Sequence, residues 1–487
     1  MVLGAGAAVL LVSVLAVRIS VRLGLPSLLL YLAIGLVIGE SGLGLRFDDA
    51  QLTQALGLAA IVLILAEGGL TTRWQAVRQA AGVGLALSTV GVAVSVGVTA
   101  AALHWLLDLD WRMALLWGSV LAATDAAAVF SVLRGLKIGG RVVGALEVES
   151  GVNDAPVFIA VLLLAADEPW TWLTPLLIGY QLVAGAALGV VLGVGGAWLL
   201  RRSALPATGL YPLATVAVCL LAFAGGQLAH ASGLLATYVA GLVLGNSRLP
   251  HRGDTLSFAE GLGWLSQIGL FVLLGIYATP RNLLGAVLPA LIACAVLVLA
   301  ARPLSVLISA TPFRVPWREQ AFMSWAGLRG AVPIVLALIP LTEGVRGARL
   351  LVDSLFVLVV VLTLLQGATL PWLGRRLGLD GTAEPHEVEV DSAPLDELDA
   401  DLLQVRVPVG SRLHGVYLSE LRLPAGATLS LVVRGGRGFT PLPETRLQEG
   451  DQLLVVSTAA ARPAAEQRIR AVHRAGRLAR WLGEAGR

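Results

Sequence analysis

The stretch that decides the fold reads Glu149-Ser150-Gly151-Val152-Asn153-Asp154-Ala155-Pro156 and lies in an apolar run of about residues 147–166. The run is close to the roughly 20 residues that a helix needs to cross a bilayer, so its acidic side chains are expected at membrane depth. An ionisable group there is costly unless it pairs or faces water, and its default interpretation is functional. Pro156 removes a backbone donor and indicates a break in the helix.

The composition extends the membrane interpretation to most of the chain. Of 487 residues, 56% are hydrophobic and 14% are Asp, Glu, Lys or Arg, whereas a soluble chain carries about a quarter charged residues. Thirteen candidate spans lie at about residues 2–19, 26–42, 54–70, 79–106, 113–133, 147–166, 172–200, 210–230, 233–248, 260–279, 283–310, 319–340 and 351–374. The first run is too long for the apolar core of a cleavable signal and lacks a basic flank.

The basic residues between these runs sort to the two sides of the membrane. Fifteen fall on one side, and the five on the other side are Arg46, Arg112, Arg281, Arg346 and Arg349. Arg302 lies inside the eleventh run and is left out of this count. Because Lys and Arg concentrate in cytoplasmic loops, the N-terminus is expected outside and the C-terminus in the cytoplasm. The expected location is a bacterial inner membrane.

The second and ninth runs resemble each other. After one gap, residues 31–41 match residues 238–247, and the third and tenth runs follow in step, with Gly68 and Gly275 ending similar Leu-rich segments. Spans seven apart cross the membrane in opposite directions, so the match predicts that spans 1–6 and 8–13 are inverted repeats. The alternative is a chance likeness between apolar segments. Proteins of this plan place ion sites at broken helices, and spans 5 and 12 are the matched pair to inspect.

The deciding stretch carries the side chains that a hard monovalent cation requires, namely several oxygen ligands and a carboxylate that balances the charge. Ser150 and Asp154 are four residues apart and so lie on one stripe of a helix, as do Glu149 and Asn153. Burial favours the protonated form of a carboxyl group, so a buried acid can hold a proton when the cation is absent. Asp154 fits both roles, with Ser150 and Thr124 of span 5 as neutral oxygen ligands.

Other charged residues in the spans have two interpretations each. Arg329 in span 12 cannot carry transported protons because it is always charged. It is expected to neutralise a buried carboxylate, or to form a purely structural pair with Glu149. Glu67 in span 3 lies either on an ion path or near its mouth in a local pair. Asp125 in span 5 either touches the ion or caps the broken half of span 12.

At these residues, over about positions 1–376, the chain resembles the monovalent cation:proton antiporter-1 family, the NhaP-type exchangers. The blocks that carry the likeness are Thr124-Asp125-Ala126, Glu149-Ser150 with Asn153-Asp154, and Gly327-Leu328-Arg329-Gly330-Ala331-Val332-Pro333. The resemblance implies an all-α polytopic membrane fold with two inverted repeats and crossed broken helices at the site. It also implies an elevator-type exchanger that forms a dimer through scaffold helices.

The same resemblance implies roles for individual residues. The implied ion ligands are Asp154, Ser150 and Thr124, and the implied buried ion pair is Glu149 with Arg329. Asn153 holds the carboxylates, and an Asn at this position is the pattern associated with electroneutral one-for-one exchange. Asp125 matches a position that stabilises the unwound segment of the partner helix. Glu67 matches an acidic position near the ion pathway, although the flanking Leu65-Ala66 is a looser match.

The composition changes abruptly after Arg376. Residues 377–401 are acidic and contain proline, and are expected to form a linker. Residues that favour strands then cluster at 402–407, 428–433 and 452–457, with glycine-containing turns between them. A short helix is expected within residues 413–421. A core of about 60 residues is marginal alone, which favours dimerisation.

Motifs in this region resemble the C-terminal subdomain of potassium-conductance regulators, called TrkA-C or RCK-C. They are Gly410–Gly415, Leu418–Leu421 and Leu447–Asp451. The resemblance covers residues 402–460 and implies a dimeric cytosolic α+β module that binds a small ligand, in some members a nucleotide, and gates a linked transporter. Residues 461–487 are expected to form a basic amphipathic helix that packs on this domain or lies on the anionic inner leaflet.

Together these features predict a secondary transporter, not an enzyme, that exchanges cytosolic K⁺ or Na⁺ for external H⁺ under the control of its soluble domain. The likeness to potassium regulators favours K⁺. The alternatives are a cation channel and a transporter-like sensor without flux, each gated by the soluble domain. A Thr-Val-Gly-Tyr-Gly filter is absent from the sequence, which counts against the channel.

Other classes of ligand receive no support from the sequence. The net charge of +3 does not indicate binding of nucleic acid. Cys219 and Cys294 both lie in apolar runs, so neither a disulfide nor a metal site is expected. No cofactor is expected apart from the transported ions and the small ligand of the soluble domain.

Overall fold

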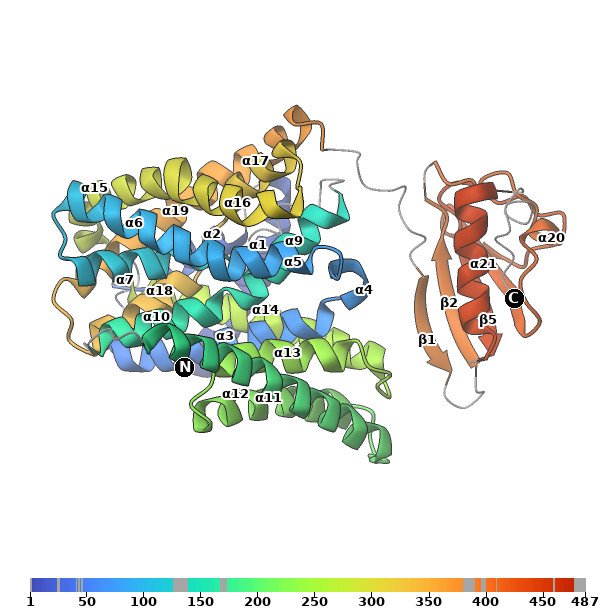
Figure 1. Ribbon diagram of the computed structural model, residues 1–487. Helices are drawn as coiled ribbons and strands as arrows, with labels where there is room; N and C mark the ends of the chain where they lie inside the picture. The colour runs from blue at the N-terminus through green and yellow to red at the C-terminus, as the bar shows by residue number, and fades with distance from the viewer. Residues whose placement is uncertain are drawn as a thin grey trace. The chain divides into compact units, whose positions relative to one another are not determined.

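The computed structural model describes residues 2–23, 27–40, 42, 44, 47–125, 139–166, 173–379, 390–395, 400–408, 410–458 and 460–476. The chain divides into two compact units, residues 1–382 and 383–487. The described part of the first unit is helical, and the second is a sheet with helices (Figure 1). The expected fold class is therefore confirmed.

Each of the thirteen expected spans overlaps at least one helix of the first unit. In the described residues, eight helical stretches are long and apolar enough to cross a membrane, and shorter apolar helices add to them. The helices up to the first kinked span are α1 (Val2–Leu23), α2 (Ser27–Ile38), α3 (Ala50–Thr71), α4 (Trp74–Val77), α5 (Ala81–Ala86), η1 (Leu87–Gly91), α6 (Val92–Leu107), α7 (Trp111–Ala122), α9 (Gly140–Val152) and α10 (Asp154–Ala165). Those that follow are α11 (Thr174–Arg202), α12 (Leu210–Leu228), α13 (Gly233–Gly245), α14 (Arg252–Tyr277), α15 (Pro280–Val296), η2 (Leu297–Ala301), α16 (Arg302–Ala310), η3 (Thr311–Phe313), α17 (Trp317–Trp325), α18 (Val332–Thr342) and α19 (Ala348–Arg376).

The two predicted repeats contact each other in a reciprocal way. Helix α2 packs on α14, and α3 packs on α13. Span 2 of the first repeat therefore contacts span 10 of the second, and span 3 contacts span 9. A Cβ atom on Gly35 would lie 2.7 Å from the Cα of Gly275, and one on Gly69 would lie 3.1 Å from the Cα of Gly241. Since Gly35 aligns with Gly241, Gly69 occupies the position equivalent to Gly275. The expected match of Gly275 with Gly68 is therefore wrong by one residue.

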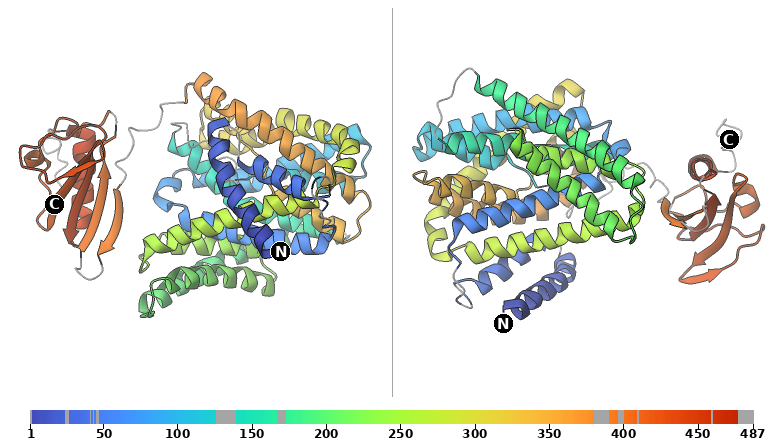
Figure 2. Two further views of the ribbon diagram at one scale, coloured as in Figure 1. Left: turned by 180° about the vertical axis from the view of Figure 1, so that it is seen from behind. Right: turned by 90° about the horizontal axis from the view of Figure 1, so that it is seen from below.

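Spans 4 and 11, which are also seven apart, share a further irregularity. Each contains one π-helical turn, η1 in span 4 and η2 in span 11. Each turn packs against the other span, η1 on α16 and η2 on α6. Single π-helical turns inside longer helices are rare, so their presence at matched places supports the inverted repeat. At one edge of the bundle, Figure 2 shows the green helices α11 and α12, which pack on α13.

Spans 5 and 12 are both interrupted, as the repeat predicts. Helix α7 ends at Ala122 and is followed by non-helical residues 123–125, while α17 and α18 are separated by residues 326–331. The two irregular segments touch, because the backbone N–H of Asp125 donates to the carbonyl of Leu328 at 3.0 Å. Residues 126–138, the expected second half of span 5, lie outside the described residues.

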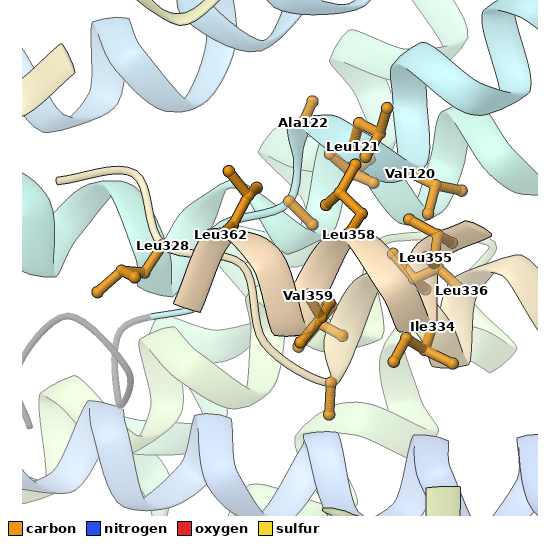
Figure 3. Close-up of a cluster of buried hydrophobic side chains, with 14 of the residues drawn as sticks. Val120, Leu121, Ala122, Leu328, Ile334, Leu336, Leu355, Leu358, Val359 and Leu362 are labelled. Atoms are coloured by element: carbon orange, nitrogen blue, oxygen red, sulfur yellow. The ribbon is translucent and has the colours of Figure 1, made fainter. Parts of the chain in front are cut away.

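Apolar packing holds these interrupted spans in place. Figure 3 shows Val120, Leu121 and Ala122 of α7 beside side chains of α19, with Leu328 and α18 around them. The other labelled members of this buried cluster are Ile334, Leu336, Leu355, Leu358, Val359 and Leu362. Helix α19 thus supports both chain breaks from one side, and fixes the backbone on which the site is built.

The second unit is a five-stranded antiparallel sheet in the order β1-β2-β5-β3-β4, accompanied by two helices. Its elements are β1 (Val390–Leu395), β2 (Ala400–Arg406), α20 (Leu418–Leu421), β3 (Ala427–Arg434), β4 (Arg437–Phe439), β5 (Gln452–Thr458) and α21 (Arg462–Ala475). The buried Asp451 accepts from Arg434 at 2.8 and 2.9 Å, and these contacts raise the pKa of Arg434 above its ordinary value. This ion pair ties the end of β3 to the turn before β5.

Two expectations for the second unit need correction or completion. Strand β1 pairs with β2 along its whole length, although residues 390–395 fall in the expected acidic linker. The linker prediction is wrong there because pairing with β2 overrides a composition that is poor in strand formers. Helix α21 packs on its own domain, since Ala465, Ile469 and Val472 are buried in the core of that unit. Residues 477–487 of the expected helix lie outside the described residues.

Candidate functional site

The deciding stretch forms a kinked helix pair. Helix α9 ends at Val152 and α10 begins at Asp154, with Asn153 between them in a helical conformation. Pro156 lies in the first turn of α10, where a missing backbone donor is tolerated. The kink keeps Ser150 and Asp154 buried in the centre of the bundle, at 4% and 3% exposure. The functional groups of the stretch therefore lie where desolvation is strongest.

The structure brings the predicted ligand residues together. The hydroxyl oxygens of Thr124 and Ser150 are 3.2 Å apart, and Nδ2 of Asn153 donates to Oγ1 of Thr124 at 2.5 Å. Oδ1 of Asp154 and Oδ1 of Asn153 are buried and have no hydrogen-bond partner in the described part of the chain. Buried polar atoms are nearly always paired, so these oxygens mark a place where a ligand or a proton completes the set.

A cavity of about 590 Å³ leads to these groups. Its wall includes Thr124, Asp125, Ser150 and Asp154, together with Glu67. The remaining polar side chains of the wall are those of Ser27, Thr71, Thr72, Glu147, Tyr238, Glu260, Trp264 and Gln267. The cavity thus extends from the C-terminal half of α3 and the middle of α14 to the junction of α9 and α10.

The expected pair of Glu149 with Arg329 is wrong. Both carboxylate oxygens of Glu149 bind the guanidinium of Arg302, one at 2.9 Å from Nη2 and the other from Nη1. Arg302 and Glu149 are 4% and 2% exposed. The absence of a side chain at Gly327 makes room for this arginine, because a Cβ there would lie 2.8 Å from its Nε.

Arg329 has a different task, at the chain break of span 5. Its Nη1 donates to the carbonyls of Ala122 and Ala123 at 3.1 and 2.7 Å. These carbonyls are left without helical partners where α7 ends, and a cation suits the negative end of a helix. Arg329 therefore caps α7 across the crossing point of the two broken spans.

Asp125 lies at the same crossing. A side chain at Gly330 would overlap its carboxylate, so Asp125 sits directly against the unwound segment of span 12. Asp125 also lines the cavity, and its role, at the ion or as a cap of the broken half of span 12, stays a prediction. Glu67 lies on the cavity wall next to Gly263, where a Cβ would be 2.8 Å from its Cγ.

Two sets of residues escaped the sequence analysis. Arg302 was left out of the loop count because it lies in an apolar run, although a lone arginine at membrane depth itself signals a buried partner. The other set is the wall group of Glu147, Thr72 and Tyr238. Helical spacing offered a signal for Glu147, which precedes Asp154 by seven residues, or about two turns of a helix.

The Arg302–Glu149 pair leads to a stability prediction. Arg302→Ala leaves Glu149 as an uncompensated buried charge, and should lower the free energy of unfolding by about 3–5 kcal/mol. The double variant with Glu149→Gln should recover part of this loss, as measured by thermal unfolding of the detergent-solubilised protein. Arg329→Ala is the matched control, because combining it with Glu149→Gln should give additive effects. Coupling of Glu149 to Arg329 instead of Arg302 would contradict the assignment.

Comparisons with known proteins identify the family of the chain. The sodium/hydrogen exchanger, transmembrane, family model matches residues 8–376, and the TrkA-C domain model matches residues 402–470. A K(+)/H(+) antiporter NhaP2 of Shewanella sp. (strain MR-4) is 37% identical over 93% of this chain and 80% of its own length. A K(+)/H(+) antiporter NhaP of Alkalimonas amylolytica is 37% identical over 92% of this chain and 79% of its own.

More distant matches share the fold. The Na(+)/H(+) antiporter ApNhaP of Aphanothece halophytica is 29% identical over 70% of this chain and 68% of its own. The structure of the sodium proton antiporter MjNhaP1 from Methanocaldococcus jannaschii at pH 8 superposes with a TM-score of 0.68 at 20% identity, covering 77% of this chain and 98% of that one. The chain belongs to the transmembrane sodium/hydrogen exchanger family of monovalent cation:proton antiporters, and carries a C-terminal TrkA-C domain.

Proposed function

We propose that this antiporter exports cytosolic K⁺ in exchange for external H⁺, with Asp154 as the group that carries each in turn. The observation that carries the proposal is the buried, unpartnered Oδ1 of Asp154 at the end of the cavity, beside Thr124 and Ser150. Potassium is favoured over sodium because the relatives at 37% identity are named K(+)/H(+) antiporters. The relative at 29% identity is named for Na⁺, and makes sodium the second candidate.

The proposed exchange follows from competition at one carboxylate. A cation at Asp154 replaces its water ligands with the carboxylate and the hydroxyl oxygens of Ser150 and Thr124. Asn153 supports this arrangement by donating to Thr124, which holds the Thr124 hydroxyl beside Ser150. When the cation leaves, burial favours the protonated carboxyl. Cation and proton therefore exclude each other at Asp154.

The charges around the crossing support one-for-one exchange. Among the described residues these are the carboxylates of half-buried Asp125 and of buried Glu149 and Asp154, and the buried guanidinium groups of Arg302 and Arg329. With every acid ionised, this group carries one excess negative charge. One K⁺ or one H⁺ neutralises it, and either loaded form avoids moving net charge through a medium of low dielectric constant.

The lining of the cavity supports a proposal about the state of the protein. It includes Thr71 and Thr72, just before Arg73 and Arg78, which belong to the arginine-rich side of the membrane. Since that side is cytoplasmic by the distribution of basic residues, the proposed state opens to the cytoplasm. An elevator-type movement would carry the crossed spans 5, 6 and 12 along α3, α13 and α14 of a dimeric scaffold.

Asp154→Asn tests the ion-carrying group. The variant keeps the shape of the side chain but cannot balance a cation or release a proton, so exchange should be abolished while insertion and folding persist. The measurement is K⁺-dependent proton flux in everted membrane vesicles, repeated with Na⁺. Asp254→Asn, on an exposed acid at the start of α14, is the control and should transport normally. Substantial flux through Asp154→Asn would overturn the assignment and leave the sensor alternative open.

One-for-one exchange gives an electrical prediction. The purified protein is reconstituted in liposomes on a solid-supported electrode, and the external K⁺ concentration is raised in one step. The pH inside the liposomes should change as K⁺ exchanges for H⁺, while the electrode records no sustained current. A pH dye in the same liposomes provides the proof of transport. Proton flux without a sustained current shows electroneutral exchange, because each cycle then moves one positive charge in each direction. A sustained current that scales with the proton flux would refute this stoichiometry.

The TrkA-C domain gives a prediction about control. A ligand shifts transport only if it binds active and inactive arrangements differently. Truncation after residue 382, at the boundary of the two compact units, should leave an active exchanger with an altered dependence on pH or on a cytosolic small molecule. The alternative role is to stabilise a dimer. Unchanged kinetics across pH and nucleotides, together with loss of the dimer on size-exclusion chromatography, would establish that alternative.

A further inference from the structure

A further carboxylate lies on the cavity wall between Asp154 and the arginine-rich end of the spans. Glu147 is on α9, seven residues before Asp154, and both residues line the cavity with Ser150 and Gly151. At 1.5 Å of rise per residue, seven residues place Glu147 about 10 Å along the helix from Asp154. An ion on its way to Asp154 through this cavity therefore passes Glu147.

The hydrogen bonds of Glu147 are short of one proton if its carboxyl group is ionised. Oγ1 of Thr72 lies 2.7 Å from Oε1 of Glu147 and also 2.7 Å from the carbonyl oxygen of Gly68. A hydroxyl has one proton to donate, and a carbonyl oxygen only accepts. Both contacts become full hydrogen bonds when Glu147 is protonated and donates to Thr72. A cation that binds the carboxylate oxygen and the hydroxyl oxygen would instead hold these two oxygens together as its ligands. The geometry fits a group that holds a proton or a cation.

A buried hydroxyl completes the wall beside Glu147. Tyr238 of α13 is 4% exposed, lines the cavity, and its hydroxyl has no hydrogen-bond partner in the described residues. The ring lies against α9 because residue 151 is glycine, and a Cβ there would be 2.8 Å from the tyrosine hydroxyl oxygen. An unpaired buried hydroxyl on a cavity wall needs a water or an ion as its partner.

The surroundings of Glu147 differ from those of Glu149, two residues later on the same helix. Glu149 is neutralised by Arg302, whereas no Arg or His of the described residues forms an ion pair with Glu147. Oxygen ligands and an unbalanced carboxylate are what hard cations select. The two glutamates therefore serve different ends, one in a structural pair and one on the ion path.

We propose that Glu147, Thr72 and Tyr238 form a second, transient site for the monovalent cation and the proton, passed before Asp154 from the side on which the cavity opens. The inference rests on the proposed exchange at Asp154, because the second site passes cations and protons on to that residue. Because it is filled and emptied on the same side of the membrane, it changes apparent affinity and leaves the exchange ratio unchanged. The site joins α9 to α3 and α13, so it exists only while these helices are in contact.

A binding experiment tests the site without relying on transport. The full chain carrying Asp154→Asn is purified in detergent, and its melting temperature is measured in KCl and in choline chloride. A ligand of the folded state raises that temperature, so Asp154→Asn should retain a K⁺-dependent increase. The double variant with Glu147→Gln should lose it. The proposal is overturned if Asp154→Asn shows no K⁺ effect, or if the double variant keeps it.

Transport kinetics provide a second test. Glu147→Gln should raise the apparent KM for K⁺ about tenfold with an unchanged maximal rate, since the variant loses one charged ligand of the cation, and tenfold corresponds to about 1.4 kcal/mol. Tyr238→Phe, which keeps the ring on Gly151, should raise KM in the same direction. Glu260→Gln removes the same charge from the same cavity, at an exposed position on α14, and is the matched control.

The two experiments separate the second site from the proposed function. Equal KM shifts in Glu147→Gln and Glu260→Gln would show a general effect of cavity charge. An unchanged KM in Glu147→Gln would show that Glu147 does not contribute to K⁺ binding. Either result overturns the second site. A wild-type protein without Asp154-dependent flux would instead overturn the proposed exchange. The melting experiment would still decide whether Glu147 binds the cation.

Discussion

The cost of burying charge determines how this protein is built. Two arginines and three acids lie around the crossing of spans 5 and 12, where an unpaired charge would be highly unfavourable. In the bidentate pair of Arg302 with Glu149 the two charges neutralise each other, and the pair links α16 to α9. Arg329 is stabilised by carbonyls at the end of α7, so the break in one span stabilises a charge on another. Oδ1 of the buried Asp154 has no hydrogen-bond partner in the described part of the chain.

Sequence reasoning reached much of the fold and the grouping of Thr124, Ser150 and Asp154, for physical reasons. Apolar runs of spanning length and the distribution of arginines are one-dimensional signals, and acids within such runs are conspicuous. The partner of Glu149 is not a one-dimensional property. Arg302 lies 153 positions away and Arg329 lies in a more prominent motif, so only the packing of α16 on the crossing chooses between them. The equivalence of Gly69 with Gly275 in the two repeats was missed for a similar reason. The sequence does not distinguish Gly68 from Gly69, and only the contacts of the helix backbones show which of the two is equivalent to Gly275.

The soluble domain shows the same division between local and tertiary information. Strands β2, β3 and β5 are rich in residues that favour extended structure and were predicted close to their observed limits. Strand β1 is acidic and contains proline, and its pairing with β2 supplies the hydrogen bonds that its own residues do not encourage. Helix α21 illustrates the reverse case, since its basic face suggested a lipid surface while its apolar face packs in the core of its own domain.

The glycine crossings of α2 with α14 and of α3 with α13 have a mechanical consequence. Where two helices meet through backbone atoms, no side chain can change rotamer to absorb a shift, so the contact behaves as a stiff joint. The inverted repeat supplies two such joints, related by the same pseudo-symmetry, and each holds a helix of one repeat against a helix of the other. The placement of spans 2 and 3 against spans 9 and 10 is thus set by four residues that have no side chain.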